Sequence, residues 1–302
     1  MLTSNIITFD NIMGKLKINT VRDSKLNEVL NYCGHEYNVI PTLVEYVGPF
    51  KEWDGITLFT DECFDLDSIH IIDEINSTIK IGWFHEPRML HGVGGCMDVR
   101  YSNAERIMDK FDYFFTYDHI LLDKFPDKAI YVVDNAIYLP HDKIKLYKKS
   151  KLMSMIYSFK QWTPGHRLRH QLAKMIDGLE LFGSGTGKHL KSKDIGLADF
   201  MFSIVIENNR TEKYFTEKIL DCFATGTIPI YWGCPNIGDY FNEKGIMSFE
   251  KIEDLPKLFS KLEDPEYYNH LLPYVKENYE KVQEYRIYED WMYNNVYKKL
   301  IK

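Results

Sequence analysis

One stretch of the chain, residues 200–233, places charged and polar side chains at spacings suited to holding an anion. It reads FMFSIVIENNRTEKYFTEKILDCFATGTIPIYWG, an apolar run that ends at Glu207 and is followed by a polar loop. A helix is predicted from Thr216, whose hydroxyl can cap free N–H groups, to Gly226, which can end it. The loop is therefore expected at the carboxyl end of a strand, where open α/β sheets bind ligands.

Lys218 falls in the first turn of this predicted helix. A cation at a helix N-terminus is unfavourable by up to about 1 kcal/mol, so it requires an anionic partner. A phosphate group is one such partner. The alternative is a neighbouring carboxylate, supplied by Glu212, Glu217 or Asp221.

The wider stretch ENNRTEKYFTEKILDCFATGTIPIYWGCPNIGDYF resembles the signature of the inverting α1,3/α1,4-fucosyltransferases, written E-N-x(5)-Y-x-T-E-K with a following P-I-Y-W-G. The spacing matches without a gap, which makes this signal specific. The resemblance implies transfer of fucose from GDP-fucose to a hydroxyl of a glycan acceptor. The residues that it assigns to donor binding are Glu207, Asn208, Tyr214, Thr216, Glu217 and Lys218.

The resemblance continues more weakly towards the N-terminus. In the family a helix arginine after a strand contacts the donor phosphates, and SFKQWTPGHRLRHQLAKMIDGLELFG is similar to that strand, helix and strand. Arg167 and Arg169 are both candidates for donor binding, and we favour Arg167 as the catalytic one. The alternative for either arginine is an ordinary solvated position on the helix.

The segment IGWFHEPR (81–88) is similar to the family's strand and following E-S-P loop, so the resemblance places the catalytic base at Glu86. The departure is that no serine separates Glu86 from Pro87. The alternative is that Glu86 pairs with Arg88 or His85 on a loop.

An inverting transfer needs a base for the acceptor hydroxyl and positive charge around the departing diphosphate. Glu86 would be the base, Lys218 and Arg167 would neutralise the diphosphate, and Glu217 would accept hydrogen bonds from donor hydroxyls. Because these cations carry the positive charge, no metal is implied as a cofactor. The D-x-D match at 65–67 follows no clear apolar strand and is expected to be a loop.

The rest of the chain predicts an α/β fold with parallel sheets, and the family resemblance makes it GT-B-like, with two facing Rossmann-like domains and a helical C-terminal return. Predicted boundaries are 1–145 for the acceptor-side domain, 151–275 for the nucleotide-sugar domain and 276–302 for helices that pack back on the first domain. The lysine-rich segment 141–151 is either the linker or a solvated helix face. Short apolar runs predict strands at 55–60, 77–84, 113–117, 129–133, 151–158, 179–183, 200–207 and 227–233, with helices at 102–111, 166–176 and 216–225.

Composition narrows the class of protein. The chain of 302 residues has a formal charge of −7, which argues against a nucleic-acid partner. The N-terminal twenty residues have no long apolar run, so neither a signal peptide nor a membrane span is predicted, and a cytoplasmic location is expected. The five cysteines are odd in number and lack a C-x-x-C pair, which suits reduced thiols.

Two other functions stay open: a transferase of this fold that uses another nucleotide-linked deoxyhexose, and a catalytically silent carbohydrate-binding relative.

Three further patterns resemble ligand-binding motifs but are not interpreted as phosphate or metal sites. FGSGTGKHL (182–190) departs from the P-loop spacing and is expected to be a turn, and GVGGCMD (92–98) is expected to be an acceptor loop. His85 and His91 lack a third metal ligand.

Overall fold

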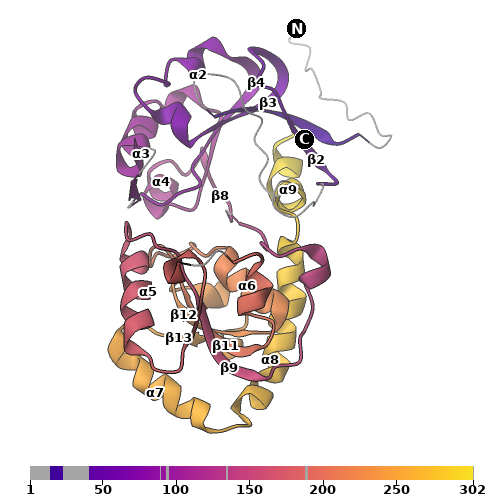
Figure 1. Ribbon diagram of the computed structural model, residues 1–302. Coiled ribbons are helices and arrows are strands. Elements are labelled where there is room, and N and C mark those ends of the chain that lie inside the picture. The colour runs from indigo at the N-terminus through magenta and orange to yellow at the C-terminus, as the bar shows by residue number, and fades with distance from the viewer. Residues whose placement is uncertain are drawn as a thin grey trace. The chain divides into compact units, whose positions relative to one another are not determined.

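The computed structural model describes residues 14–22, 41–88, 90–92, 95–133, 135–187 and 190–301 (Figure 1). The chain forms two compact units, Met1–Asp134 with Ile287–Lys302, and Asn135–Arg286. Each unit holds a sheet whose described strand pairs are all parallel. The predicted α/β class with two parallel sheets and a helical C-terminal part is confirmed. The first unit ends before the expected boundary at residue 145.

The sheet of the first unit has the order β2-β1-β3-β4-β7-β8. The four strands predicted here are present: β3 (Glu52–Thr60), β4 (Asn76–Trp83), β7 (Tyr113–Thr116) and β8 (Ala129–Tyr131). The strands β1 (Leu16–Val21) and β2 (Val44–Val47) were not predicted. Polar residues interrupt the apolar pattern of β1, although Asn19 is fully buried and its Nδ2 donates to Phe50 O at 3.0 Å and Thr57 Oγ1 at 3.1 Å.

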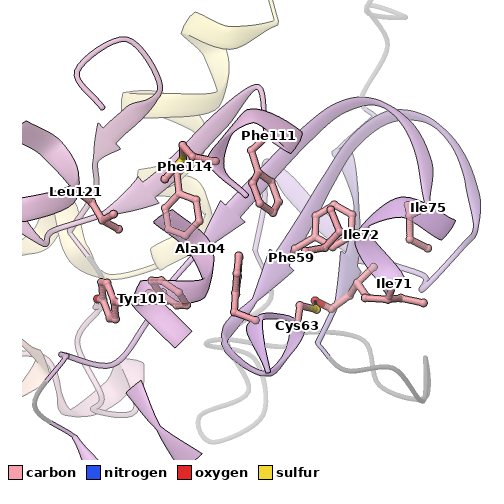
Figure 2. Packing of buried hydrophobic residues seen from close by; sticks show 14 of the residues in the cluster. Phe59, Cys63, Ile71, Ile72, Ile75, Tyr101, Ala104, Phe111, Phe114 and Leu121 are labelled. Atoms are coloured by element: carbon pink, nitrogen blue, oxygen red, sulfur yellow. Dashed lines mark hydrogen bonds between the residues drawn. The ribbon is translucent and has the colours of Figure 1, made fainter. Parts of the chain in front are cut away.

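Helices pack against this sheet and close its core. They are α2 (Ile71–Glu74), α3 (Met97–Arg106) and α4 (His119–Lys124). The predicted crossover helix at 102–111 therefore begins five residues earlier, and a short 3-10 turn, Met108–Lys110, follows it. Figure 2 shows Phe59, Phe111 and Phe114 gathered between the sheet and these helices, with 5.8 Å between the ring centroids of Phe111 and each of the other two.

The end of the chain belongs to the first unit. Helix α9 (Tyr288–Met292) presents Asp290, whose Oδ1 accepts hydrogen bonds from the backbone N–H groups of Thr42 and Leu43, both at 2.9 Å. Tyr288 stacks on Trp83 of β4 with 5.6 Å between ring centroids. These contacts join residues more than 200 positions apart in the sequence.

The sheet of the second unit has the order β10-β9-β11-β12-β13. Its strands are β9 (Lys151–Ile156), β10 (Glu180–Phe182), β11 (Phe200–Ile206), β12 (Ile228–Trp232) and β13 (Met247–Ser248). The helices α5 (Pro164–Met175), α6 (Glu217–Thr225), α7 (Leu255–Phe259) and α8 (Tyr267–Val282) complete the unit (Figure 1). The strands and helices predicted between 151 and 233 are confirmed, to within a few residues at their ends.

The lysine-rich segment 141–151 is not a solvated helix face. Only His141–Lys143 forms a 3-10 turn, and residues 144–150 run as irregular chain within the second unit. Lys149 Nζ donates to the carbonyl oxygens of Leu197, Ala198 and Thr225, at 3.2, 3.0 and 2.8 Å. Burial lowers the pKa of Lys149 to about 7. The amine thus secures this segment against the loop before β11 and the end of α6.

Candidate functional site

The carboxyl end of β11 is joined to the start of α6 by one buried carboxylate. Glu207 follows the strand directly and is fully buried. Its Oε1 accepts from the Thr216 N–H at 2.9 Å, and its Oε2 accepts from the Thr216 hydroxyl at 2.6 Å. Thr216 is also the N-cap of α6, because its Oγ1 accepts from the Lys218 N–H at 3.4 Å. Glu207 therefore holds the loop 208–215 closed at its two ends.

A second helix begins at the same loop. Helix α5 is capped by Thr163, whose hydroxyl accepts from the His166 N–H at 3.2 Å. The Gly165 N–H donates to Asn208 O at 3.1 Å. A Cβ at Gly165 would overlap the Glu207 carbonyl oxygen, so only glycine allows this close approach. Two helix N-termini, each the positive end of a helix dipole, thus meet at one strand end; in α5 the Gly165, His166 and Arg167 N–H groups already donate to Asn208 and Thr163.

The two candidate arginines of α5 occupy different environments. Arg169 is 5% exposed, and its guanidinium donates to Ile206 O, through Nε at 2.9 Å, and to Asn208 Oδ1 at 3.0 Å. Arg167 is exposed, near the N-terminus of the helix, and its NH1 donates to Gln161 O at 3.4 Å. Arg169 therefore holds the end of β11 and the start of the loop through hydrogen bonds, whereas the guanidinium of Arg167 lies in solvent.

Several cations lie near His166 at the start of α5. Burial lowers the pKa of His166 to about 3, and the nearby cations Arg169, Lys160 and Lys218 lower it in the same direction. The imidazole is neutral at physiological pH. A cluster of cations around two helix N-termini is an environment that favours an anionic ligand.

Among the described residues, the contacts of Lys218 Nζ are to oxygen atoms of Thr216, Glu217 and Glu207. It lies 2.9 Å from Thr216 Oγ1, 3.2 Å from Glu217 Oε1 and 3.5 Å from Glu207 Oε2. Its side chain is 26% exposed, so the amine is accessible from solvent. The alternative, a neighbouring carboxylate as the partner of Lys218, is therefore what the structure shows: Glu217 is one of the predicted partners, and Glu207 is a further one.

A second lysine, which is not among the predicted site residues, reaches the Glu217 carboxylate. Lys193 Nζ lies 3.2 Å from Glu217 Oε1 and 3.1 Å from Asp221 Oδ2. Burial raises the pKa of Glu217, but Lys193 and then Lys218 more than offset this, and the net pKa lies below the usual range. Burial raises the pKa of Asp221 to about 6 although Lys193 opposes the shift. No motif marks Lys193, since it lies outside the signature segment and 24 residues before Glu217.

The C-terminal part of the loop 208–215 contacts residues that follow β12. Tyr214 is 4% exposed, and its neighbour Lys213 has a φ of 64°, a left-handed conformation that is rare outside glycine. The Lys213 N–H donates to Asn236 Oδ1 at 2.8 Å. A Cβ at Gly233 would lie 2.6 Å from Glu207 Cγ, which explains the glycine that ends the P-I-Y-W-G run.

In the first unit, Glu86 lies on the loop after β4 and is exposed. Arg88 is committed elsewhere: its guanidinium forms a paired contact with Asp118, at 2.9 and 3.0 Å, and contacts Glu105 at 2.9 Å. It also lies 4.3 Å from the ring centroid of Tyr101, whose hydroxyl donates to Glu86 O at 3.2 Å. The structure therefore does not pair Arg88 with Glu86 and instead uses it to fix the loop.

The remaining patterns behave as follows. Asp65 of the D-x-D match lies in a turn and accepts from Arg100 through both carboxylate oxygens, at 2.7 Å each. Within the described ranges, no group of three potential ligands is arranged to hold a metal ion, and no helix has the length and hydropathy that a membrane span requires. Residues 188 and 189 of FGSGTGKHL, residues 93 and 94 of GVGGCMD, and the side chain of His91 lie outside the described part.

Two α/β units, each with a parallel sheet, and a helical C-terminal part form a GT-B glycosyltransferase fold. Two solved α1,3-fucosyltransferase structures share it at a TM-score of 0.50. One is 17% identical and covers 76% of each chain; the other, a complex with GDP-fucose, is 15% identical and covers 92% of this chain and 91% of that one. At residues 146–300, just over half of its length, the chain matches glycosyltransferase family 10 (fucosyltransferase), C-terminal part, and it belongs to this family.

Curated relatives match over a shorter stretch. The α-(1,3)-fucosyltransferase FucT of Helicobacter pylori is 33% identical over 103 residues, which is 32% of this chain and 21% of that protein. The human 4-galactosyl-N-acetylglucosaminide 3-α-L-fucosyltransferase 9 is 28% identical over 111 residues, 35% of this chain and 30% of that protein. The matches thus take in less than a third of these relatives' own length.

Proposed function

We propose that the protein is an inverting glycosyltransferase that moves fucose from GDP-fucose to a hydroxyl of a glycan acceptor. The observation that carries this proposal is the carboxyl end of β11, where two helix N-termini, Lys218 and the E-N-x(5)-Y-x-T-E-K segment come together. Family membership and the names of the relatives support fucose as the sugar.

In this proposal the diphosphate lies at the start of α6. Lys218 exchanges its contacts with Glu217 and Glu207 for phosphate oxygens, and the positive end of the helix dipole adds to the attraction. Exposed Arg167 is the arginine that can reach a ligand in solvent, while Arg169 holds the loop. Because these groups carry the positive charge that the leaving group needs, the proposed chemistry involves no metal ion.

The hydroxyl-binding role falls to Glu217. Its lowered pKa keeps the carboxylate ionised at any physiological pH, so it accepts hydrogen bonds from ribose or sugar hydroxyls. Asn208 and Tyr214 border the same loop and orient the donor. Glu207, fully buried and occupied by Thr216, acts through the position of α6 rather than by touching the donor.

Glu86 is the proposed base that takes the proton from the acceptor hydroxyl. Its exposed carboxylate is accessible to a substrate, and Arg88 and Tyr101 hold its backbone in place. The acceptor is a glycan hydroxyl, and its identity is open to a screen. A cytoplasmic location stays a prediction from the sequence.

A panel of donors in a thermal unfolding assay tests the donor assignment. GDP-fucose, GDP-mannose, UDP-sugars and dTDP-sugars are each added, and a ligand at a hundred times its Kd adds about 2.7 kcal/mol to the free energy of unfolding. We expect stabilisation by GDP-fucose and GDP. Stabilisation by a dTDP-deoxyhexose alone would instead favour the other transferase, and none by any nucleotide would overturn the proposal.

Two variants test the catalytic roles. Lys218→Ala is expected to lower kcat/KM about a hundredfold or more, as for loss of one charge-stabilising donor, with exposed Lys174→Ala as the matched control. Glu86→Gln is expected to abolish transfer while GDP binding is unchanged. Comparable transfer by the glutamine variant would assign the base to another carboxylate, and donor binding without any transfer by the natural chain would favour a silent relative.

A further inference from the structure

We infer that Lys193 is a positioning residue of the donor site: it binds Glu217 and Asp221 and so releases Lys218 to an anionic ligand. The inference rests on the proposed function, because it concerns the same phosphate-binding helix start. It assigns a role to a residue outside the signature segment and outside α6 itself.

Two lysines contact the same carboxylate oxygen of Glu217. Lys193 Nζ and Lys218 Nζ each lie 3.2 Å from Glu217 Oε1. The two amines compete for this carboxylate, so a stronger contact with one weakens the hold on the other. Lys193 approaches from the 3-10 turn Lys193–Gly196, whereas Lys218 lies on α6 beside Glu217.

Asp221 is the second carboxylate that Lys193 contacts. It lies one turn after Glu217 on α6, and its side chain is 1% exposed. Its Oδ1 accepts from the Tyr138 N–H at 2.7 Å, and its Oδ2 lies 3.1 Å from Lys193 Nζ. Two carboxylates at this spacing repel each other, and Lys193 bridges them. The amine also lies 5.0 Å from the ring centroid of Tyr138, which keeps it on this side of the helix.

Carboxylates and cations around the start of α6 balance each other when Lys193 is present. The carboxylates are Glu207, Glu217 and Asp221, and the cations that face them are Arg169, Lys193 and Lys218. With Lys193 in place the two signs are equal in number. Without it the cluster carries an excess negative charge, which opposes a diphosphate and holds Lys218 more firmly on Glu217.

When a diphosphate draws Lys218 away, Glu217 loses one of its two cations. Lys193 remains on the carboxylate, so Glu217 is not left as a largely buried charge without compensation. The exchange of Lys218 between carboxylate and phosphate is therefore less costly. This is the physical reason for placing a second lysine here.

The test measures the Kd of GDP by titration calorimetry for the natural chain, Lys193→Met, Lys193→Arg and the control Lys191→Met, which removes an exposed charge two residues away. We expect Lys193→Met to weaken GDP binding about tenfold, the size typical of coupled groups in contact, and the other two variants to stay within about twofold. The variant Lys193→Met, Asp221→Asn should recover most of the affinity, because it removes the excess carboxylate but keeps the Oδ1 acceptor for Tyr138.

The rescue separates charge from structure. If Lys193→Met merely damaged the fold, adding Asp221→Asn would not restore the Kd, and this result would overturn the inference. Unchanged GDP affinity in Lys193→Met would overturn it too, while the proposed function would stand. Failure of the natural chain to bind any nucleoside diphosphate would overturn both.

Discussion

The close approach of α5 to the loop after β11 makes Gly165→Ala a sharp perturbation. In most helices this change stabilises, by up to about 1 kcal/mol, because alanine loses less backbone entropy on folding than glycine. At Gly165 the added Cβ would overlap the Glu207 carbonyl oxygen and lie 2.9 Å from its carbonyl carbon and 3.0 Å from Asn208 O. These are backbone atoms, which cannot turn aside as a flexible side chain can.

The clash determines whether Gly165→Ala raises or lowers the free energy of unfolding. Overpacking against backbone costs roughly 1 to 3 kcal/mol, and the shift also strains the Gly165 N–H to Asn208 O bond, worth about 1 kcal/mol. After subtracting the helix gain of about 1 kcal/mol, we expect Gly165→Ala to lower the free energy of unfolding by about 1 to 3 kcal/mol. The same shift separates the two helix N-termini, so GDP affinity should fall about tenfold or more.

Urea unfolding followed by tryptophan fluorescence measures the first effect, and calorimetric titration with GDP measures the second. Gly14→Ala is the matched control, since a Cβ there meets nothing within 4 Å in the described part of the chain, and it should change stability by less than about 0.5 kcal/mol. A Gly165→Ala variant as stable as the natural chain, with unchanged GDP affinity, would refute the reasoning that this contact positions the site.

Three further predictions concern the same region. Thr216→Val removes the α6 cap and the hydrogen bond to buried Glu207, and should lower the free energy of unfolding by about 2 to 4 kcal/mol in urea. Arg169→Lys, which breaks the fork on Ile206 O, should destabilise by about 2 kcal/mol, whereas Arg167→Ala should leave stability unchanged and weaken GDP binding. The pKa of Asp221 in the folded protein, about 6, lies above the 3.8 of an unperturbed aspartate. Stability therefore falls as pH rises from about 3.8 to 6, by up to about 3 kcal/mol, and Asp221→Asn should remove this loss.

Each of these predictions has an outcome that contradicts it. A Thr216→Val chain within about 0.5 kcal/mol of the natural one would show that Glu207 does not depend on the hydroxyl. Weakened GDP binding in Arg169→Lys alone, with natural stability, would exchange the roles of the two arginines. For Asp221 the comparison is between pH 4.5 and 6.5 in urea titrations. The lowered pKa of Glu217 acts below this window and with the opposite sign, so an equal pH dependence in Asp221→Asn would contradict the assignment.

The chain's own order of residues was sufficient to predict the strand, loop and helix at 200–233. That prediction works because the determinants are local: a continuous apolar run for a strand buried on both faces, a capping threonine at Thr216 and a terminating glycine at Gly226. The family signature lies in the same segment, so most donor-side candidates followed from one motif. The four predicted strands of the first unit are also local apolar runs.

Strand β1 shows where local pattern fails. Its buried Asn19 and Thr20 give a polar pattern that indicates a loop, and only pairing with distant carbonyl and hydroxyl groups makes their burial tolerable. The last segment of the chain likewise reaches the first unit through Asp290 and Tyr288, contacts between residues more than 200 positions apart.

The tertiary structure alone decided how the site is arranged. Two arginines two residues apart on α5 look equivalent in sequence, but the helix turns one towards Ile206 O and the other towards solvent. Lys193 joins the cluster only because its turn packs beside α6. Residue type and order are enough to predict local elements, since these depend on near neighbours, whereas burial and charge pairing depend on groups that folding brings together from distant parts of the chain.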